Sequence, residues 1–189
     1  MKLFGNTIFI TGGGSGIGRG LAEALHKRGN KVIIAGRRRG HLDMVIAANP
    51  GMEAVELDIT DPASISRVAA SLIAEHPELN VLINNAGVMQ TDAAGGRIDD
   101  ALMAAAITTN LMGPIRMTSA LIEHLKTRKD AVVAYTSSVL GFTPMAATAV
   151  YSSTKAALHS YILSQRFLLC CATRASACLR LRRPGCAPN

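Results

Sequence analysis

TGGGSGIG, residues Thr11–Gly18, is a glycine cluster that stands between two apolar stretches of different periodicity. The stretch before it, NTIFIT at Asn6–Thr11, is a β-branched run typical of a buried strand, and the stretch after it has apolar residues at helical spacing as far as Gly29. A second buried strand, KVIIAG at Lys31–Gly36, follows directly. Because parallel strands need a crossover helix between them, these residues predict one βαβ unit.

The alternation of strand and helix continues along the chain. Strands that alternate with helices form a doubly wound parallel sheet, so we expect an α/β protein with a Rossmann-type, three-layer α/β/α fold. No repeat or linker marks a second domain. The further strands are predicted at 53–58, 80–87 and 131–138, and the further helices at 62–76, 99–128 (interrupted near Gly113 and Pro114) and 150–169.

Three glycines of the cluster fit the binding of a dinucleotide pyrophosphate. Gly12 permits the tight turn, Gly16 lets the backbone approach the pyrophosphate, and Gly18 lets the helix pack closely on the strand. The N-terminus of the helix adds unpaired N–H groups and a positive dipole. A glycine cluster alone is also typical of an ordinary turn, but the strand before it and the helix after it favour a dinucleotide site.

The second strand ends in GRRRG, where NAD-binding proteins of this kind have a carboxylate for the ribose 2′-hydroxyl. Arg37, Arg38 and Arg39 cannot accept hydrogen bonds from that hydroxyl, whereas a guanidinium binds a 2′-phosphate through its planar fork. The sequence therefore predicts NADP(H) in preference to NAD(H). Which arginine makes the contact stays open, with Arg37 nearest the strand end, and a solvated basic loop is the alternative.

Tyr151 and Lys155 are four residues apart on the last predicted helix, so their side chains share one face. Their Cα atoms are about 6 Å apart along the helix axis. An ammonium beside a phenol stabilises the phenolate, which allows a tyrosine to act as general acid/base near neutral pH. Taken alone, such a pair is more often an ordinary helix face.

Five motifs together resemble the short-chain dehydrogenase/reductase family, in its order and at its spacing, from residue 6 to about 169. They are TGGGSGIG, NNAG at Asn84–Gly87, Asn110, Ser138 and YSSTK at Tyr151–Lys155. More narrowly, VYSSTKAALHSY resembles the bacterial DltE-like subgroup. The resemblance implies reversible hydride transfer between NADP(H) and a carbonyl or alcohol substrate, with residues 1–169 as one NADP-binding domain that holds the catalytic residues.

The resemblance also implies a role for each matching residue. Tyr151 exchanges the proton with the substrate oxygen, and Lys155 also holds the nicotinamide ribose. Ser138 hydrogen-bonds the substrate oxygen, and Asn110 holds a water of the proton relay. Ser137 is the weaker candidate, because successive side chains of a strand point to opposite faces. The cofactor-binding residues expected are Gly12, Ser15, Gly16, Ile17, Gly18, Arg37, Asp58, Ile59, Asn85, Ala86, Gly87, Tyr151 and Lys155.

The composition limits the partners. The chain of 189 residues is 49% hydrophobic and carries a formal charge of +7, but residues 1–165 hold fifteen basic and thirteen acidic side chains, a charge of only +2. No run of about 18 apolar residues could span a membrane, and the start of the chain does not resemble a signal peptide. We therefore expect a cytoplasmic protein that binds neither nucleic acid, membrane nor metal. The resemblance adds a homo-oligomer formed through helices 111–128 and 150–169.

Residues 170–189 are basic and rich in cysteine, and they depart from the family pattern, which continues with a sixth strand, a substrate loop and a last strand. The cysteines match no usual zinc-ligand spacing, and disulfides are not expected in the cytoplasm. In another reading frame, synonymous codings of Ala172–Pro188 resemble the absent strand and turn. We therefore hypothesise a frameshift around Arg166–Cys171. A truncated fragment that at most binds dinucleotide is the alternative to an active enzyme.

Overall fold

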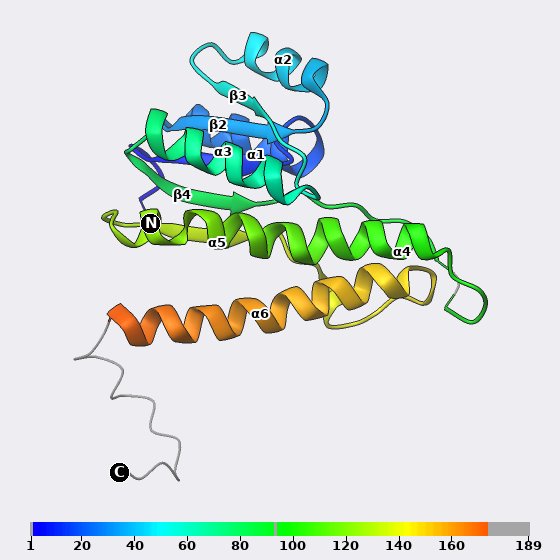
Figure 1. Cartoon of the computed structure of the whole chain (residues 1–189). Coiled ribbons are helices and arrows are strands. Elements are labelled where there is room, and N and C mark those ends of the chain that lie inside the picture. The colour runs from blue at the N-terminus through cyan, green and yellow to red at the C-terminus, as the bar shows by residue number, and fades with distance from the viewer. Residues whose placement is uncertain (1, 93, 174–189) are drawn as a thin grey trace, which may run out of the picture.

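A computed structural model describes residues 2–92 and 94–173 of the chain. The strands are β1 (Thr7–Thr11), β2 (Lys31–Gly36), β3 (Glu53–Glu56), β4 (Leu79–Asn84) and β5 (Val132–Tyr135). The helices are α1 (Gly16–His26), α2 (Arg39–Ala48), α3 (Pro62–Glu75), α4 (Asp100–Ile107), α5 (Gly113–Lys126) and α6 (Ala149–Thr173). All five strands are parallel and lie in the order β3-β2-β1-β4-β5 (Figure 1). The order reverses at β1, so the carboxyl ends of β1 and β4 meet where open parallel sheets bind ligands.

Helices cover both faces of the sheet. Successive residues of β1 point to opposite faces, so Ile8 and Ile10 pack with α1 and α2, while Phe9 packs with α3 and α5. Every residue of β1 is buried, whereas β5, at the edge of the described sheet, is only half-buried. The predicted three-layer, doubly wound fold is confirmed.

Two helices begin at aspartates that cap them. Asp61 precedes α3 and Asp99 precedes α4, and each carboxylate accepts hydrogen bonds from the backbone N–H groups two and three residues further on. Such caps satisfy donors that have no partner inside the helix. They fix where each helix starts.

The irregularity expected near Gly113 and Pro114 is a π-helical turn, η1 (Thr108–Met112), that joins α4 to α5 without a break. Pro114 falls in the first turn of α5, where its missing N–H group is tolerated. The α-helical geometry is thus interrupted directly before Gly113, close to where an interruption was predicted, but the helical stretch continues through it. Single π-helical turns are frequent at functional sites.

Other boundaries also differ from the sequence predictions. The strands β3, β4 and β5 end two or three residues earlier than expected, and α2 was not predicted at all. The helix α6 continues through residue 169, where a domain boundary was expected, to Thr173. The rest of the cysteine-rich tail, residues 174–189, lies outside the described residues.

Within the described ranges, no helix is long and apolar enough to cross a membrane. In the same part of the chain, no group of three or more His, Cys, Asp or Glu side chains is placed to hold a metal ion.

Candidate active site

A cleft of about 730 Å³ opens at the carboxyl ends of β1, β2 and β4. It is formed by the glycine loop (residues 11–18), the arginine segment after β2 (residues 37–39), the segment after β4 and the first turns of α6. Segments far apart in sequence thus meet at one edge of the sheet, as parallel topology requires. The predicted site residues that line it are Gly12, Ser15, Gly16, Ile17, Arg37, Ile59, Asn85, Ala86, Gly87, Tyr151 and Lys155.

The glycine loop has a backbone that other residues would not adopt without strain. Gly12 has φ +71° and Gly16 has φ +54°, both in the left-handed region. Gly18 does not line the cleft. It is buried, and a side chain there would collide with the carbonyl oxygen of Gly12 and the side chain of Asn85. Gly18 therefore allows α1 to pack against the loop, while Gly12 and Gly16 shape the wall of the cleft.

The N-terminus of α1 faces the cleft and has no side-chain cap. Ser15 occupies the cap position but makes no side-chain hydrogen bond to the helix, unlike the aspartates that precede α3 and α4. Ile17 in the first turn is 72% exposed, although it is apolar. Uncapped N–H groups and the helix dipole form an electropositive surface suited to a phosphate group.

The arginine segment divides into two parts. Arg37 and Arg38 line the cleft together with His41. Arg39 instead forms an ion pair with Asp43 on α2, with Nε and Oδ1 2.9 Å apart. Arg37 and Arg38 are therefore the two guanidinium groups placed to meet an anion in the cleft.

Tyr151 and Lys155 come from the first turns of α6. The ammonium nitrogen of Lys155 lies 5.7 Å from the centre of the Tyr151 ring and donates a 2.8 Å hydrogen bond to the carbonyl oxygen of Thr136. Lys155 is only 4% exposed, and this burial lowers its pKa from the ordinary lysine value. The pair thus places a phenol and a largely buried ammonium together in the wall of the cleft.

The segment after β4 is held by Thr11, a residue that the sequence analysis did not single out. Its hydroxyl accepts hydrogen bonds from the N–H groups of Asn85 (3.0 Å) and Ala86 (3.1 Å). The amide of Asn85 donates to the carbonyls of Thr11 and Gly12, and its oxygen accepts from the Thr136 hydroxyl. Asn85 therefore ties the ends of β1, β4 and β5 together.

Asn110 lies on the π-helical turn and is almost fully buried. Its side-chain oxygen accepts from the N–H of Val88, and its amide donates to the carbonyl of Val88, both at 2.8 Å. The amide also donates to the hydroxyl of Thr154 on α6 at 3.3 Å. In the structure Asn110 links the segment after β4 to the helix that carries Tyr151.

Four predicted residues lie outside the lining of the cleft: Gly18 and Asn110, described above, and Ser138 and Asp58. Ser138 is three residues beyond β5, and its hydroxyl accepts from the N–H of Leu140 at 3.2 Å, starting a short 3₁₀ turn, η2 (Val139–Gly141). The carboxylate of Asp58 accepts from the hydroxyl (2.7 Å) and N–H (2.9 Å) of Thr60. Those bonds, with the nearby charge of Arg37, lower the pKa of Asp58.

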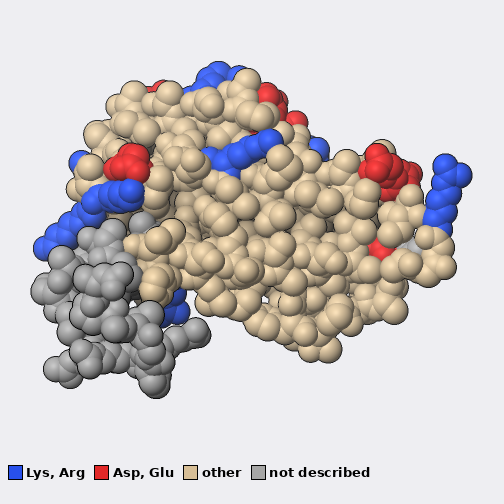
Figure 2. Space-filling view, turned by 60° about the horizontal axis from the view of Figure 1, so that its bottom comes forward, with Lys and Arg blue, Asp and Glu red and all other residues tan. Residues whose placement is uncertain are grey.

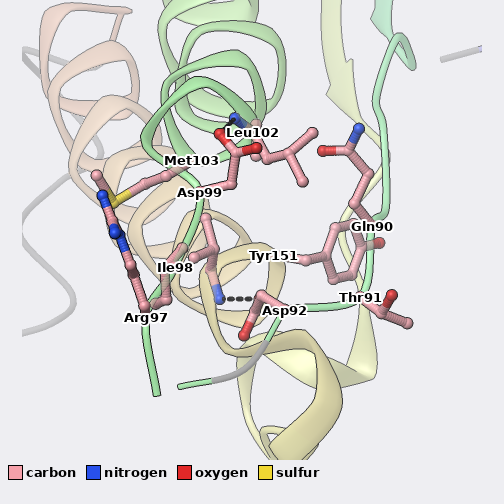
Figure 3. A pocket seen from close by; sticks show the side chains of 11 residues that line it. Gln90, Thr91, Asp92, Arg97, Ile98, Asp99, Leu102, Met103 and Tyr151 are labelled. Carbon is pink, nitrogen blue, oxygen red and sulfur yellow. Dashed lines mark hydrogen bonds between the residues drawn. The ribbon is translucent and has the colours of Figure 1, made fainter. Parts of the chain in front are cut away.

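A smaller pocket of about 210 Å³ lies beside Tyr151, between α4, the start of α6 and the segment after β4. Figure 3 shows the Tyr151 ring next to Gln90, with Leu102 and Met103 on the opposite side. Tyr151 lines both this pocket and the larger cleft.

Comparison with known proteins identifies the family. The sequence model of the short chain dehydrogenases matches residues 6–169. The chain belongs to the short-chain dehydrogenase family. This short-chain dehydrogenase is 35% identical over 170 residues to the uncharacterised oxidoreductase DltE of Bacillus subtilis, covering 89% of this chain and 68% of that protein. The predicted resemblance to the DltE-like oxidoreductases is confirmed.

Solved structures of short-chain dehydrogenases share the fold. One from Streptomyces avermitilis is 34% identical with a TM-score of 0.82, covering 87% of this chain and 61% of that one. Another, from Burkholderia phymatum in complex with NAD, is 25% identical with a TM-score of 0.84, covering 91% of this chain and 63% of that one. This short-chain dehydrogenase therefore spans roughly two thirds of the length of its relatives.

Proposed function

We propose that this chain is an NADP(H)-dependent oxidoreductase that transfers a hydride between the cofactor and a carbonyl or alcohol substrate. The observation that carries the proposal is the position of the Tyr151–Lys155 pair at one end of a cleft whose other walls are the glycine loop and the arginine segment. An acid/base pair and a dinucleotide-sized groove in one cleft are what a hydride-transfer site needs.

The residues present fit a dinucleotide. The uncapped N-terminus of α1 suits the pyrophosphate, and Arg37 and Arg38 suit a 2′-phosphate, which favours NADP(H) over NAD(H). Among the described residues, the ammonium of Lys155 has one hydrogen-bond acceptor, the carbonyl of Thr136, so two of its N–H groups can bind ribose hydroxyls. The bound cofactor would supply or accept the hydride.

The side chains of the protein would transfer the proton. In reduction, the Tyr151 hydroxyl gives its proton to the substrate oxygen as the hydride reaches the carbonyl carbon, and the ammonium of Lys155 stabilises the resulting phenolate. In oxidation both transfers reverse. Ser138 is proposed to orient the substrate oxygen, which requires its hydroxyl to serve the substrate as well as the N–H of Leu140. Asn110 is proposed to hold a water of the proton relay.

We further propose that two copies of the chain associate through α5 and α6. Leu163, Phe167 and Leu168 on α6 are each more than half exposed. Figure 2 shows the side of the molecule that carries α6, where a wide area without charged side chains extends below and to the right of a Lys or Arg side chain in the upper middle of the view. Exposed apolar surface of this kind favours association. Light scattering on the purified chain tests it, and a monomer at all concentrations would contradict it.

Turnover of the 189-residue chain with NADPH and a panel of aldehydes and ketones tests the enzymatic proposal. The expected result is NADPH consumption that depends on the carbonyl compound and falls at least about 100-fold in Tyr151→Phe. Binding of NADPH without turnover would contradict catalysis and support the fragment that only binds dinucleotide.

A further inference from the structure

Asp92 holds the first turn of α6 from outside the helix. It lies in the segment between β4 and α4, and its two carboxylate oxygens accept hydrogen bonds from the N–H of Ala149 (3.1 Å) and the N–H of Val150 (2.8 Å). Its own N–H donates to the carbonyl of Ala147 at 3.0 Å. Figure 3 shows the Asp92 carboxylate at the start of the helix.

The helix does not supply this cap itself. Thr148 stands directly before α6, where a threonine side chain commonly caps, but its hydroxyl lies 3.5 Å from both the Met145 carbonyl and the Ser152 hydroxyl. The first N–H groups of a helix have no partner within it. Among the described residues, Asp92 is the side chain that satisfies those of Ala149 and Val150.

The cap acts on the residue directly before Tyr151. The 2.8 Å bond to the N–H of Val150 holds the Ala149–Val150 peptide, one residue before the Cα that carries the Tyr151 side chain. One turn further along α6, Thr154 accepts a bond from Asn110, which also binds both backbone groups of Val88. The segment from Val88 to Asp92 is thus connected to both ends of the helical turn that carries Tyr151.

We infer that Asp92 is a positioning residue that sets the orientation of Tyr151 toward the cleft. The inference rests on the proposed role of Tyr151. A tyrosine on a frayed first turn would spend less time in the productive geometry, and misplacement by about 1 Å can cost about 100-fold in rate. Asp92 would therefore affect the chemical step more than cofactor affinity, because the glycine loop and the arginine segment lie on other elements than α6.

Asp99 offers a matched control. It is a second aspartate in the same segment and also accepts two backbone bonds at a helix start, but it caps α4 rather than α6. The experiment compares Asp92→Ala, Asp92→Asn and Asp99→Ala in the full chain. The measurements are kcat, KM for the carbonyl compound, the Kd for NADPH, and the NMR signal of Tyr151 in protein with isotope-labelled tyrosine, assigned with Tyr151→Phe.

We expect Asp92→Ala to lower kcat about 10-fold or more with the Kd for NADPH within about twofold of the starting value, and to shift or broaden the Tyr151 signal. Asp92→Asn, which keeps one side-chain oxygen acceptor, should recover part of kcat, and Asp99→Ala should retain both kcat and the signal. The NADPH measurement shows that each variant is folded.

Equal effects of Asp92→Ala and Asp99→Ala, or an unmoved Tyr151 signal in Asp92→Ala, would overturn the inference. If the unsubstituted chain does not turn over, the NMR signal alone decides about Asp92. Absence of turnover then counts against the proposed function and not against the positioning role.

Discussion

The ammonium nitrogen of Lys155 lies 5.7 Å from the centre of the Tyr151 ring and is bonded to the carbonyl of Thr136. A buried ammonium that has one acceptor among the described residues is costly to folding, so its presence points to a functional reason. Lys155→Met keeps most of the length of the side chain and removes the charge. We expect turnover to fall at least about 100-fold while the melting temperature stays equal or rises. A variant that keeps more than a tenth of the turnover would contradict the role of Lys155.

Gly18 and Gly20 are both on α1 but meet different surroundings. A Cβ at Gly18 would collide with the backbone of Gly12, whereas nothing lies within 4 Å of one at Gly20. We expect Gly18→Ala to cost about 2 kcal/mol of unfolding free energy and to weaken NADPH binding. Gly20→Ala should stabilise the chain by about 0.5–1 kcal/mol, because alanine favours a helix. Urea unfolding of both variants checks this, and equal stability of the two would refute the packing argument.

The arginine segment should determine the preference for NADPH. Arg37→Gln and Arg38→Gln are each expected to raise the Kd for NADPH about 10-fold and to leave the Kd for NADH nearly unchanged, because only NADPH carries the 2′-phosphate. Arg39→Gln is the control, since Arg39 pairs with Asp43. Calorimetric titration measures all three. If Arg39→Gln has the largest effect, the assignment of the cleft arginines is wrong.

Asp58 should make stability depend on pH. Hydrogen bonds from Thr60 hold the pKa of Asp58 below the unfolded value of 3.8, so its contribution to stability is present above that pH and is lost as pH falls through the lowered pKa. Asp58→Asn should therefore melt lower than the original chain at pH 7, by a margin that shrinks near pH 3. Asp43→Asn, at an exposed ion pair on α2, should show little change. A margin that does not depend on pH would exclude this explanation.

Much of the fold follows from local sequence patterns. The apolar run of β2 and the glycine cluster before α1 identify a βαβ unit, because each pattern has few structural solutions. The helix α2 was missed because it begins within a run of arginines, at Arg39, and has no side-chain cap at its start. The exact ends of strands could not be predicted either, since β5 ends at Tyr135, three residues before the end expected at Ser138.

The residues of the candidate site were predictable only where they belong to a sequence motif. The sequence placed Tyr151 and Lys155 on one helix face, and the structure brings them to the same cleft as the glycine loop. Thr11 and Asp92 were missed because each acts on a partner more than fifty residues away, so no local spacing signals the contact. Aspartate is a typical helix cap, but which helix Asp92 caps emerges only from tertiary structure, as does the contact of Thr11 with the segment after β4.

Transfer of deuterium from NADPH labelled at C4 tests the proposed chemistry most directly. The chain is incubated with the labelled cofactor and a reactive aldehyde or ketone, and the alcohol is examined by mass spectrometry. We expect the label on the former carbonyl carbon, and we expect Tyr151→Phe, which can still bind the cofactor but cannot give the proton, to form at most about 1% as much labelled alcohol. Labelled product at the same rate in Tyr151→Phe, or none from the original chain, would contradict it.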